Sequence, residues 1–322
     1  CASRWVPDSP RGGPAAGRGG GGGRAPPPPD GGLTALDEAD GTWDVVVDTW
    51  SAAPRAVRDT ARLLRERAGR YVYVSSRSVY EWPAPAGATE EAPVVAGARA
   101  DAGRTDYARD KRGGELAAVE AFGADRSVLV RAGLILGPYE NVGRLPWWLN
   151  RMARGGPVLA PGPRDLPLQY VDVRDLAEWI LGAAEQGLGG PYNLTGPQGH
   201  ETMGTLLEAC AEVTGGSAEL RWTAPEAILR AGIEPWTQLP VWVPPDSEMH
   251  DAMHATDVSR ALATGLRCRP VTETAADTWR WLRGLGGTAP LRRDRTAKGL
   301  DPKTEAEVLA AAREPDGGGE RV

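Results

Sequence analysis

The sequence predicts an α/β protein with a doubly wound parallel sheet, and two observations carry this fold class. Short continuous apolar runs, typical of strands buried on both faces, occur at residues 44–50, 71–76 and 127–131. Segments with apolar residues at helical spacing separate these runs, and alternation of strand and helix implies right-handed crossovers between parallel strands. The 322 residues provide one large domain, or two modest ones, with a sizeable buried core.

The first 32 residues differ from the rest, because they contain 10 glycines and 7 prolines and no isoleucine, leucine, methionine, phenylalanine or tyrosine. Such a segment cannot bury enough apolar surface to offset the entropy lost on ordering. We therefore expect a disordered tail, with a short polyproline II stretch at the prolines 26–29. Its four arginines leave a second interpretation open, namely an arm that touches RNA.

The regular elements begin at residue 33, since residues 33–36 are compatible with the end of a short helix. Pro54 stands where a helix can begin, and apolar residues follow it at helical spacing. Residues 81–104 are rich in proline, alanine and glycine and predict a long loop. The elements predicted around this loop are strands at 44–50, 71–76 and 127–131, which residues 134–136 can prolong, and helices from residue 54 and at 107–122.

Shorter elements follow toward the C-terminus. Asp175 is a candidate N-cap for the helix that follows a strand at 170–173. The remaining predicted elements are a strand at 192–195, amphipathic helices at 201–214 and 272–283, and a surface helix at 301–313.

Composition excludes several classes of function. The net charge is −6, and an acidic chain without clustered basic residues is a poor nucleic-acid binder. No apolar run approaches the roughly 20 residues that cross a bilayer, and no stretch has the pattern of a secretion signal. The three cysteines are far apart, which favours the reducing cytoplasm over a disulfide framework. We expect a cytoplasmic protein with a small-molecule substrate, with no nucleic-acid or membrane partner, and with a homodimer left open.

One group of residues can carry chemistry. A predicted strand ends in Ser76, and Tyr107 and Lys111 lie four residues apart on a predicted helix, hence on one face. A lysine ammonium favours the phenolate of a nearby tyrosine and so lowers the pKa of the phenol. With the serine hydroxyl on the same substrate oxygen, the three residues form a proton relay for oxidising an alcohol or reducing a carbonyl, with a nicotinamide as hydride partner. The simpler interpretation is a solvated helix pair and a serine in a turn.

Four segments and a fifth near the C-terminus are distinctive as sequence strings. They are residues 71–80 (YVYVSSRSVY), 105–111 (TDYARDK), 128–138 (VLVRAGLILGP), 169–177 (QYVDVRDLA) and 265–270 (GLRCRP). In this order and spacing they resemble the NAD-dependent epimerase/dehydratase family, the extended or atypical short-chain dehydrogenase/reductases. The resemblance covers about residues 33–285 and implies a Rossmann-like fold, NAD or NADP as cofactor, and oxidoreductase or isomerase activity.

The resemblance implies roles for individual positions. Ser76 matches the catalytic serine or threonine, Tyr107 the catalytic acid and base, and Lys111 the residue that holds the nicotinamide ribose and tunes the tyrosine. The implied cofactor contacts are Thr49, Trp50, Ser51, Val74, Tyr107, Lys111, Ala132, Leu134 and Ile135. The implied substrate contacts are Ser78, Arg144, Trp147 and Gln169.

The resemblance also implies a division of the chain into regions. After the tail at 1–32 come a partial dinucleotide-binding domain at 33–138, to which 169–196 return, a smaller substrate-side region at 139–168 and 197–285, and a charged C-terminal tail at 286–322.

The chain departs from the family at its beginning. The family opens with a strand, a glycine-rich turn and a helix that hold the pyrophosphate on backbone N–H groups, and residues 44–50 resemble its fourth strand. Residues 17–22 (GRGGGG) fit the glycine pattern formally but lack the strand before it and the amphipathic helix after it. We therefore expect an N-terminally truncated sheet with residues 44–50 as an exposed edge, and residues 1–32 not to represent the family's N-terminus. Ala132 also stands where many relatives have proline.

These observations predict an NAD(P)-dependent oxidoreductase or epimerase/dehydratase that acts on a nucleotide sugar or another small hydroxyl or keto compound. Reduction and epimerisation share the hydride step, so the motif does not separate them. The alternative is a catalytically inactive relative that serves as an RNA- or protein-binding module. His250 and His254 have the spacing of a helical zinc pair, but we interpret this segment as an exposed polar loop and expect no metal.

Overall fold

The computed structural model describes residues 33–38, 41–292 and 299–311. The chain divides into two compact units, residues 1–40 and 41–322. In the first unit the described part holds one short helix, α1 (Thr34–Asp37), where the sequence indicates a helix end. The expectations for residues 1–32 lie outside the described residues.

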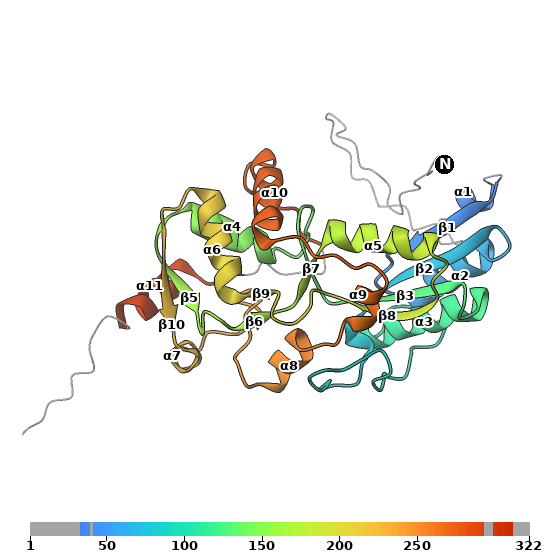
Figure 1. Cartoon of the computed structure of the whole chain (residues 1–322), viewed down its shortest axis with the longest axis horizontal. Coiled ribbons are helices and arrows are strands. Elements are labelled where there is room, and N and C mark those ends of the chain that lie inside the picture. Colours follow the sequence, from blue (N-terminus) through green and yellow to red (C-terminus); the bar gives the residue numbers. More distant parts are fainter. Residues whose placement is uncertain (1–32, 39–40, 293–298, 312–322) are drawn as a thin grey trace, which may run out of the picture. The chain divides into compact units, whose positions relative to one another are not determined.

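Four parallel strands form the central sheet of the second unit (Figure 1). Their order across the sheet is β1 (Trp43–Asp48), β2 (Ala68–Ser76), β3 (Ser127–Ala132) and β8 (Gly190–Leu194). Each connection between neighbouring strands contains a helix, as parallel pairing requires.

Helices bury both faces of this sheet, because successive side chains of a strand point to opposite faces. Tyr73 packs on the face covered by α2 (Pro54–Leu64) and α3 (Tyr107–Phe122). Val72 packs on the opposite face, under α5 (Val173–Glu185). In Figure 1, α5 and α3 lie on opposite sides of the sheet. The doubly wound parallel α/β fold predicted from the sequence is confirmed.

β1 is the outer strand of the sheet in the part of the chain that the structure describes. Its Val47 is 42% exposed. Val45 and Val46 are half-buried and pack against the two cores on opposite faces of the sheet. The expected exposed edge is therefore present, although only one of its three valines is largely open to solvent.

A second core builds the C-terminal region. It joins α4 (Arg144–Ala153), α6 (Met203–Thr214) and α10 (Val271–Gly284) around the fully buried Trp148 and Trp242. β5 (Gly156–Pro161) pairs in parallel with β10 (Ala218–Thr223) beside these helices. The shorter elements are η1 (Arg77–Val79), β6 (Pro167–Leu168), β9 (Glu201–Thr202), α7 (Pro225–Arg230), α8 (Glu248–His254) and α9 (Ser259–Ala263). Within the described residues, no helix combines the length and the apolar character needed to cross a membrane.

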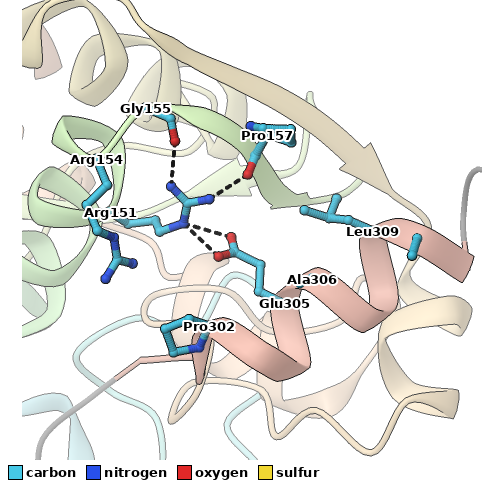
Figure 2. Close-up of a pocket in the computed structure, with 9 residues that line it drawn as sticks. Arg151, Arg154, Gly155, Pro157, Pro302, Glu305, Ala306 and Leu309 are labelled. Atoms are coloured by element: carbon cyan, nitrogen blue, oxygen red, sulfur yellow. Dashed lines mark hydrogen bonds and ion pairs between the residues drawn. The ribbon is translucent and has the colours of Figure 1, made fainter.

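The last described helix, α11 (Pro302–Ala311), is fixed to this core by a buried ion pair (Figure 2). Arg151 donates from Nε to both carboxylate oxygens of Glu305, at 2.9 and 2.7 Å, and from its other two nitrogens to the carbonyl oxygens of Gly155 and Pro157. A hollow of about 450 Å³ lies beside the pair. The predicted surface helix therefore forms, but one of its faces is packed on α4 and β5.

Two local expectations are wrong. Residues 134–136 do not prolong β3; they form β4 (Leu134–Leu136), which leaves the central sheet and pairs with β7 (Tyr170–Asp172). The N-cap of α5 is Asp172, whose carboxylate accepts a hydrogen bond from the first turn at 2.8 Å. Asp175 lies inside that turn and binds Arg269 of the following region instead.

Candidate active site

The carboxyl ends of the central strands bring together the segments that the sequence singled out. β1 ends at Asp48, just before Trp50, and Ser76 at the end of β2 is paired with Ala132 at the end of β3. α3 packs against β2 and begins at Tyr107. In parallel α/β sheets, ligands bind outside the carboxyl ends of the strands, so this edge is the candidate active site.

Lys111 is buried and hydrogen-bonded at the carboxyl ends of the strands. Its side chain is 2% exposed, and Nζ donates to the carbonyl oxygens of Trp50 at 2.7 Å and Val74 at 2.6 Å. The ammonium also lies 4.8 Å from the centre of the Tyr73 ring. Lys111 thus ties α3 to the ends of both β1 and β2.

The surroundings of Lys111 lower the pKa of its ammonium from 10.5 to about 8. Burial is the largest cause, because it disfavours the charged form. The carboxylates of Asp48 and Glu115 oppose this effect, and the positive charge of Arg292 adds to it. The group is still mostly protonated at pH 7.

Tyr107 is the first residue of α3, so Tyr107 and Lys111 are one turn apart on the same helix. Asp106 caps the helix by accepting hydrogen bonds from the backbone of Ala108 at 3.0 Å and Arg109 at 3.3 Å. The Tyr107 side chain is 39% exposed, and its hydroxyl makes no hydrogen bond to any residue that the structure describes. The phenol is therefore accessible to solvent and free of hydrogen bonds to the described residues.

Ser76 ends β2 and caps η1. Its Oγ accepts a hydrogen bond from the backbone N–H of Ser78 at 3.1 Å and donates to Ser78 Oγ, also at 3.1 Å. Ser76 is half-buried and Ser78 is exposed. Among the described residues, no hydrogen bond links Ser76 directly to Tyr107 or Lys111, so the three share an edge without forming a closed relay.

The other positions implied as cofactor contacts fall into three groups. Thr49 and Trp50 are exposed and Ser51 is half-buried, at the end of β1. Val74 and Ile135 are half-buried and pack against the core under α5. The remaining two residues are buried: Ala132 lies at the end of β3 and Leu134 lies in β4.

The four implied substrate contacts come from three different segments of the chain. Arg144 and Trp147 lie on α4 in the C-terminal region, and Ser78 lies on η1. Gln169 is fully buried, and its amide donates to the carbonyl oxygens of Gly196 and Thr256, both at 2.9 Å. The Gln169 amide oxygen accepts from the backbone N–H of Thr256 at 2.7 Å. Its amide is thus engaged in holding two chain segments together.

A buried polar network behind α3 was not found by sequence reasoning. Arg131 of β3 is paired with the fully buried Glu115 of α3, through Nε to Oε1 at 3.0 Å and Nη2 to Oε2 at 3.2 Å. Arg131 also donates to the hydroxyl of Tyr80 and to the carbonyl oxygen of Glu90. The one available signal was an arginine inside an apolar strand, which must find a partner.

The histidine pair differs from the expectation. Ser247 caps α8, and His250 and His254 are 9% and 1% exposed, so this segment is a helix with both histidines on its buried face and not an exposed loop. Nδ1 of His254 accepts a hydrogen bond from the backbone N–H of Gln169 at 3.0 Å, and burial lowers its pKa to about 3. Among the described residues no group of histidine, cysteine, aspartate and glutamate side chains is arranged to hold a metal ion.

Comparison with known proteins points to one family. Residues 40–195 match the sequence model of the NAD dependent epimerase/dehydratase family. A search of curated protein sequences found no match.

Solved structures with a similar fold include three enzymes with bound cofactors. WbmG of Bordetella bronchiseptica, in complex with NAD and UDP, is 16% identical, with a TM-score of 0.54 over 83% of this chain and 80% of that one. UDP-glucuronic acid 4-epimerase of Bacillus cereus, in complex with NAD, is 14% identical, with a TM-score of 0.51 over 79% and 77% of the two chains. RMD of Pseudomonas aeruginosa, complexed with NADPH, is 16% identical, with a TM-score of 0.50 over 75% and 82%. At these identities the similarity is one of fold.

Proposed function

We propose that this chain, a member of the NAD dependent epimerase/dehydratase family through residues 40–195, uses a nicotinamide dinucleotide to reduce, epimerise or dehydrate a small hydroxyl or keto compound, most suitably a nucleotide sugar. The observation that carries the proposal is the placement of Lys111 one turn after Tyr107, pinned to the ends of β1 and β2 beside Ser76. The NAD, UDP and NADPH bound to the similar structures support the cofactor and the substrate class.

The described residues suit the nicotinamide end of such a cofactor. An ammonium has three N–H donors, and the carbonyl oxygens of Trp50 and Val74 occupy two of those of Lys111. The third can reach a ribose hydroxyl, beside the exposed end of β1. The described part of the chain before β1 contains no strand, glycine-rich turn and helix for the pyrophosphate, so the residues identified here concern the nicotinamide end.

When bound, the nicotinamide would accept a hydride from the substrate carbon or return one to it. In the oxidative direction Tyr107 takes the proton of the substrate hydroxyl as the C–H bond gives up its electron pair, and a carbonyl forms. The Ser76 hydroxyl turns from Ser78 Oγ to donate a hydrogen bond to the same oxygen, and Lys111 donates to the ribose. In the reductive direction Tyr107 returns the proton.

The pKa of Lys111 sets an upper limit to the pH at which this mechanism operates. Below a pH of about 8 the ammonium keeps its charge and its third N–H donor. Above that pH the charge is lost, and with it the third N–H donor. The affinity for the cofactor is therefore expected to fall as the pH rises through 8 to 9.

We propose the division of the chain into a cofactor side and a substrate side on the same grounds. Residues 33–138, with 169–196, are proposed as the cofactor side, and residues 139–168 and 197–285 as the substrate side. Arg144, Trp147 and Ser78 are proposed substrate contacts, and the small number of cysteines favours a cytoplasmic location.

The first test is binding and turnover with and without the Tyr107 hydroxyl. NADH and NADPH are titrated against tryptophan fluorescence, and the protein is then incubated with NAD⁺ or NADP⁺ and sugars carrying uridine, thymidine or guanosine diphosphate. Tyr107→Phe should bind cofactor within about twofold of the wild type and lose at least about 100-fold in turnover. Tyr192→Phe is the matched control, because the Tyr192 ring packs against Trp179 in the core under α5, and it should leave turnover unchanged.

Each result has a clear meaning. Tighter binding of one dinucleotide identifies the cofactor. Binding of neither at millimolar concentration contradicts the proposal and favours the alternative, an inactive relative with a binding role. Full turnover by Tyr107→Phe would remove the phenol from the mechanism.

A further inference from the structure

Arg77 lies between Ser76 and Ser78, and its side chain leaves the sheet edge to reach α8. Nη1 donates to the carbonyl oxygen of Met253 at 3.1 Å and Nη2 to that of Ala252 at 2.5 Å. The last carbonyl groups of a helix have no partner inside the helix and carry partial negative charge. A guanidinium is suited to this position because its planar fork can bond to two carbonyl oxygens at once.

α8 is held firmly on its other side. The backbone N–H of Gln169 donates to Nδ1 of His254, and Gln169 Oε1 accepts from the backbone N–H of Thr256. The backbone N–H of Gly87 donates to the carbonyl oxygen of Ala255 at 2.5 Å. The end of α8 is thus fixed to two separate segments, at Gln169 and Gly87, and Arg77 adds the turn at 76–78 to them.

The arginine is also confined along its length. A Cβ placed on Gly133 would lie 3.6 Å from Arg77 Cδ, so the stem passes beside Gly133 at ordinary van der Waals distance. The Nε–H of Arg77 is buried and has no hydrogen-bond partner in the described part of the chain. Leaving a buried donor unpaired costs about 1–3 kcal/mol. The Arg77 side chain therefore links the turn to α8 although one of its own buried donors stays unpaired.

We propose that Arg77 is a positioning residue, which clamps the turn at 76–78 to the end of α8 and thereby holds the Ser76 hydroxyl where the substrate oxygen binds. The inference rests on the proposed function, since Ser76 is a catalytic residue only if the protein carries out that chemistry. It assigns α8 a part in the active site although none of its side chains has a catalytic role.

The expected loss in kcat follows from the contacts that the turn at 76–78 would lose without the Arg77 guanidinium. Without the two bonds to Ala252 and Met253, the turn keeps the pairing of Ser76 with Ala132 and the bond from Val95 N–H to the Val79 carbonyl oxygen at 2.8 Å, but it loses its link to α8. A displacement of about 1 Å at a reacting group can lower the rate about 100-fold. We expect Arg77→Met to lower kcat by about 10- to 100-fold with KM and the dissociation constant of NADH changed less than about threefold. Arg77→Lys, which can keep one bond, should fall between.

Arg70 provides a matched control on the same strand. It lies toward the other end of β2 and also donates to two backbone carbonyl oxygens, those of Asp125 at 2.6 Å and Leu188 at 2.5 Å. Arg70→Met therefore removes the same kind of contact away from the active site, and kcat should stay within about twofold of the wild type.

The experiment measures kcat and KM with the nucleotide sugar turned over by the wild type, and hydrogen–deuterium exchange of the full-length variants without ligand. The proposal predicts faster exchange at 76–80 and at 248–255 together in Arg77→Met, and at neither segment in Arg70→Met. Unchanged exchange at 76–80 overturns it, and so does faster exchange with an undiminished kcat. If the wild type turns over no substrate, the proposed function fails, and the exchange result alone decides whether the clamp exists.

Discussion

Replacement of Lys111 by methionine should change how stability depends on pH. Lys111 is 2% exposed, and burial lowers the pKa of its ammonium from 10.5 to about 8. In the unfolded chain the group titrates near 10.5. Between these values the unfolded chain binds more protons than the folded protein, so the free energy of unfolding rises with pH. Methionine has a similar length and no charge, so the variant lacks this rise.

The magnitude follows from the two pKa values. One pKa unit corresponds to about 1.4 kcal/mol, so keeping Lys111 charged at pH 7 costs the folded protein about 3 kcal/mol. From pH 7 to pH 9.5 the wild type should recover about 2 kcal/mol of that amount relative to Lys111→Met. Contributions of the other titrating groups cancel in the difference, because both proteins carry them.

The measurement is urea unfolding followed by tryptophan fluorescence at several pH values from 7 to 9.5, with linear extrapolation to water. Lys303→Met is the control, because the Lys303 side chain is 86% exposed, and its difference from the wild type should not vary with pH. The reasoning is refuted if the difference in the free energy of unfolding between wild type and Lys111→Met stays constant within about 0.5 kcal/mol. It is also refuted if the wild type loses stability relative to Lys111→Met as the pH rises.

Two further substitutions test the packing of α3. Glu115→Gln should lower the free energy of unfolding by about 3 kcal/mol in urea titrations, because it leaves the Arg131 guanidinium buried without its carboxylate; a loss below about 1 kcal/mol would contradict this. Gly114→Ala should destabilise by about 1–3 kcal/mol despite the better helix propensity of alanine, since the added Cβ would lie 2.5 Å from the Tyr73 hydroxyl. Gly182→Ala on α5, where the nearest atom is 3.8 Å away, should instead raise the melting temperature; the same sign for both glycines would count against the clash.

The sequence predicted the elements whose signals are local. The helix at 107–122 coincides with α3, because Asp106 caps its start and Gly123, at φ 78°, ends it. The first three strands of the central sheet were found to within a few residues, because each contains a continuous apolar run. The candidate residues Tyr107 and Lys111 were found for the same reason, since their spacing is a property of one helix.

The parts that the sequence did not reveal depend on contacts between distant segments. The burial of His254 follows from its bond to Gln169, which lies 85 residues earlier in the chain. The partner of Arg131 is 16 residues away on another element. The sequence predicted residues 134–136 as an extension of β3, because no feature of the neighbouring residues indicates that they pair with β7. Composition and spacing do not contain this information.

The hydrogen bonds of Lys111 to the strand ends depend on two glycines that the sequence did not single out. Gly113 and Gly114 stand in the middle of α3, where glycine costs about 1 kcal/mol relative to alanine. A Cβ on Gly113 would lie 2.6 Å from the carbonyl oxygen of Ala98 and 2.8 Å from Pro54 Cγ. A Cβ on Gly114 would collide with the Tyr73 ring. The pair therefore lets α3 lie close against β2 and the start of α2. At that close approach the ammonium of Lys111, two residues earlier, can touch the carbonyl groups at the ends of two strands. The local cost in helix stability and the burial of the lysine charge are consequences of the same close packing.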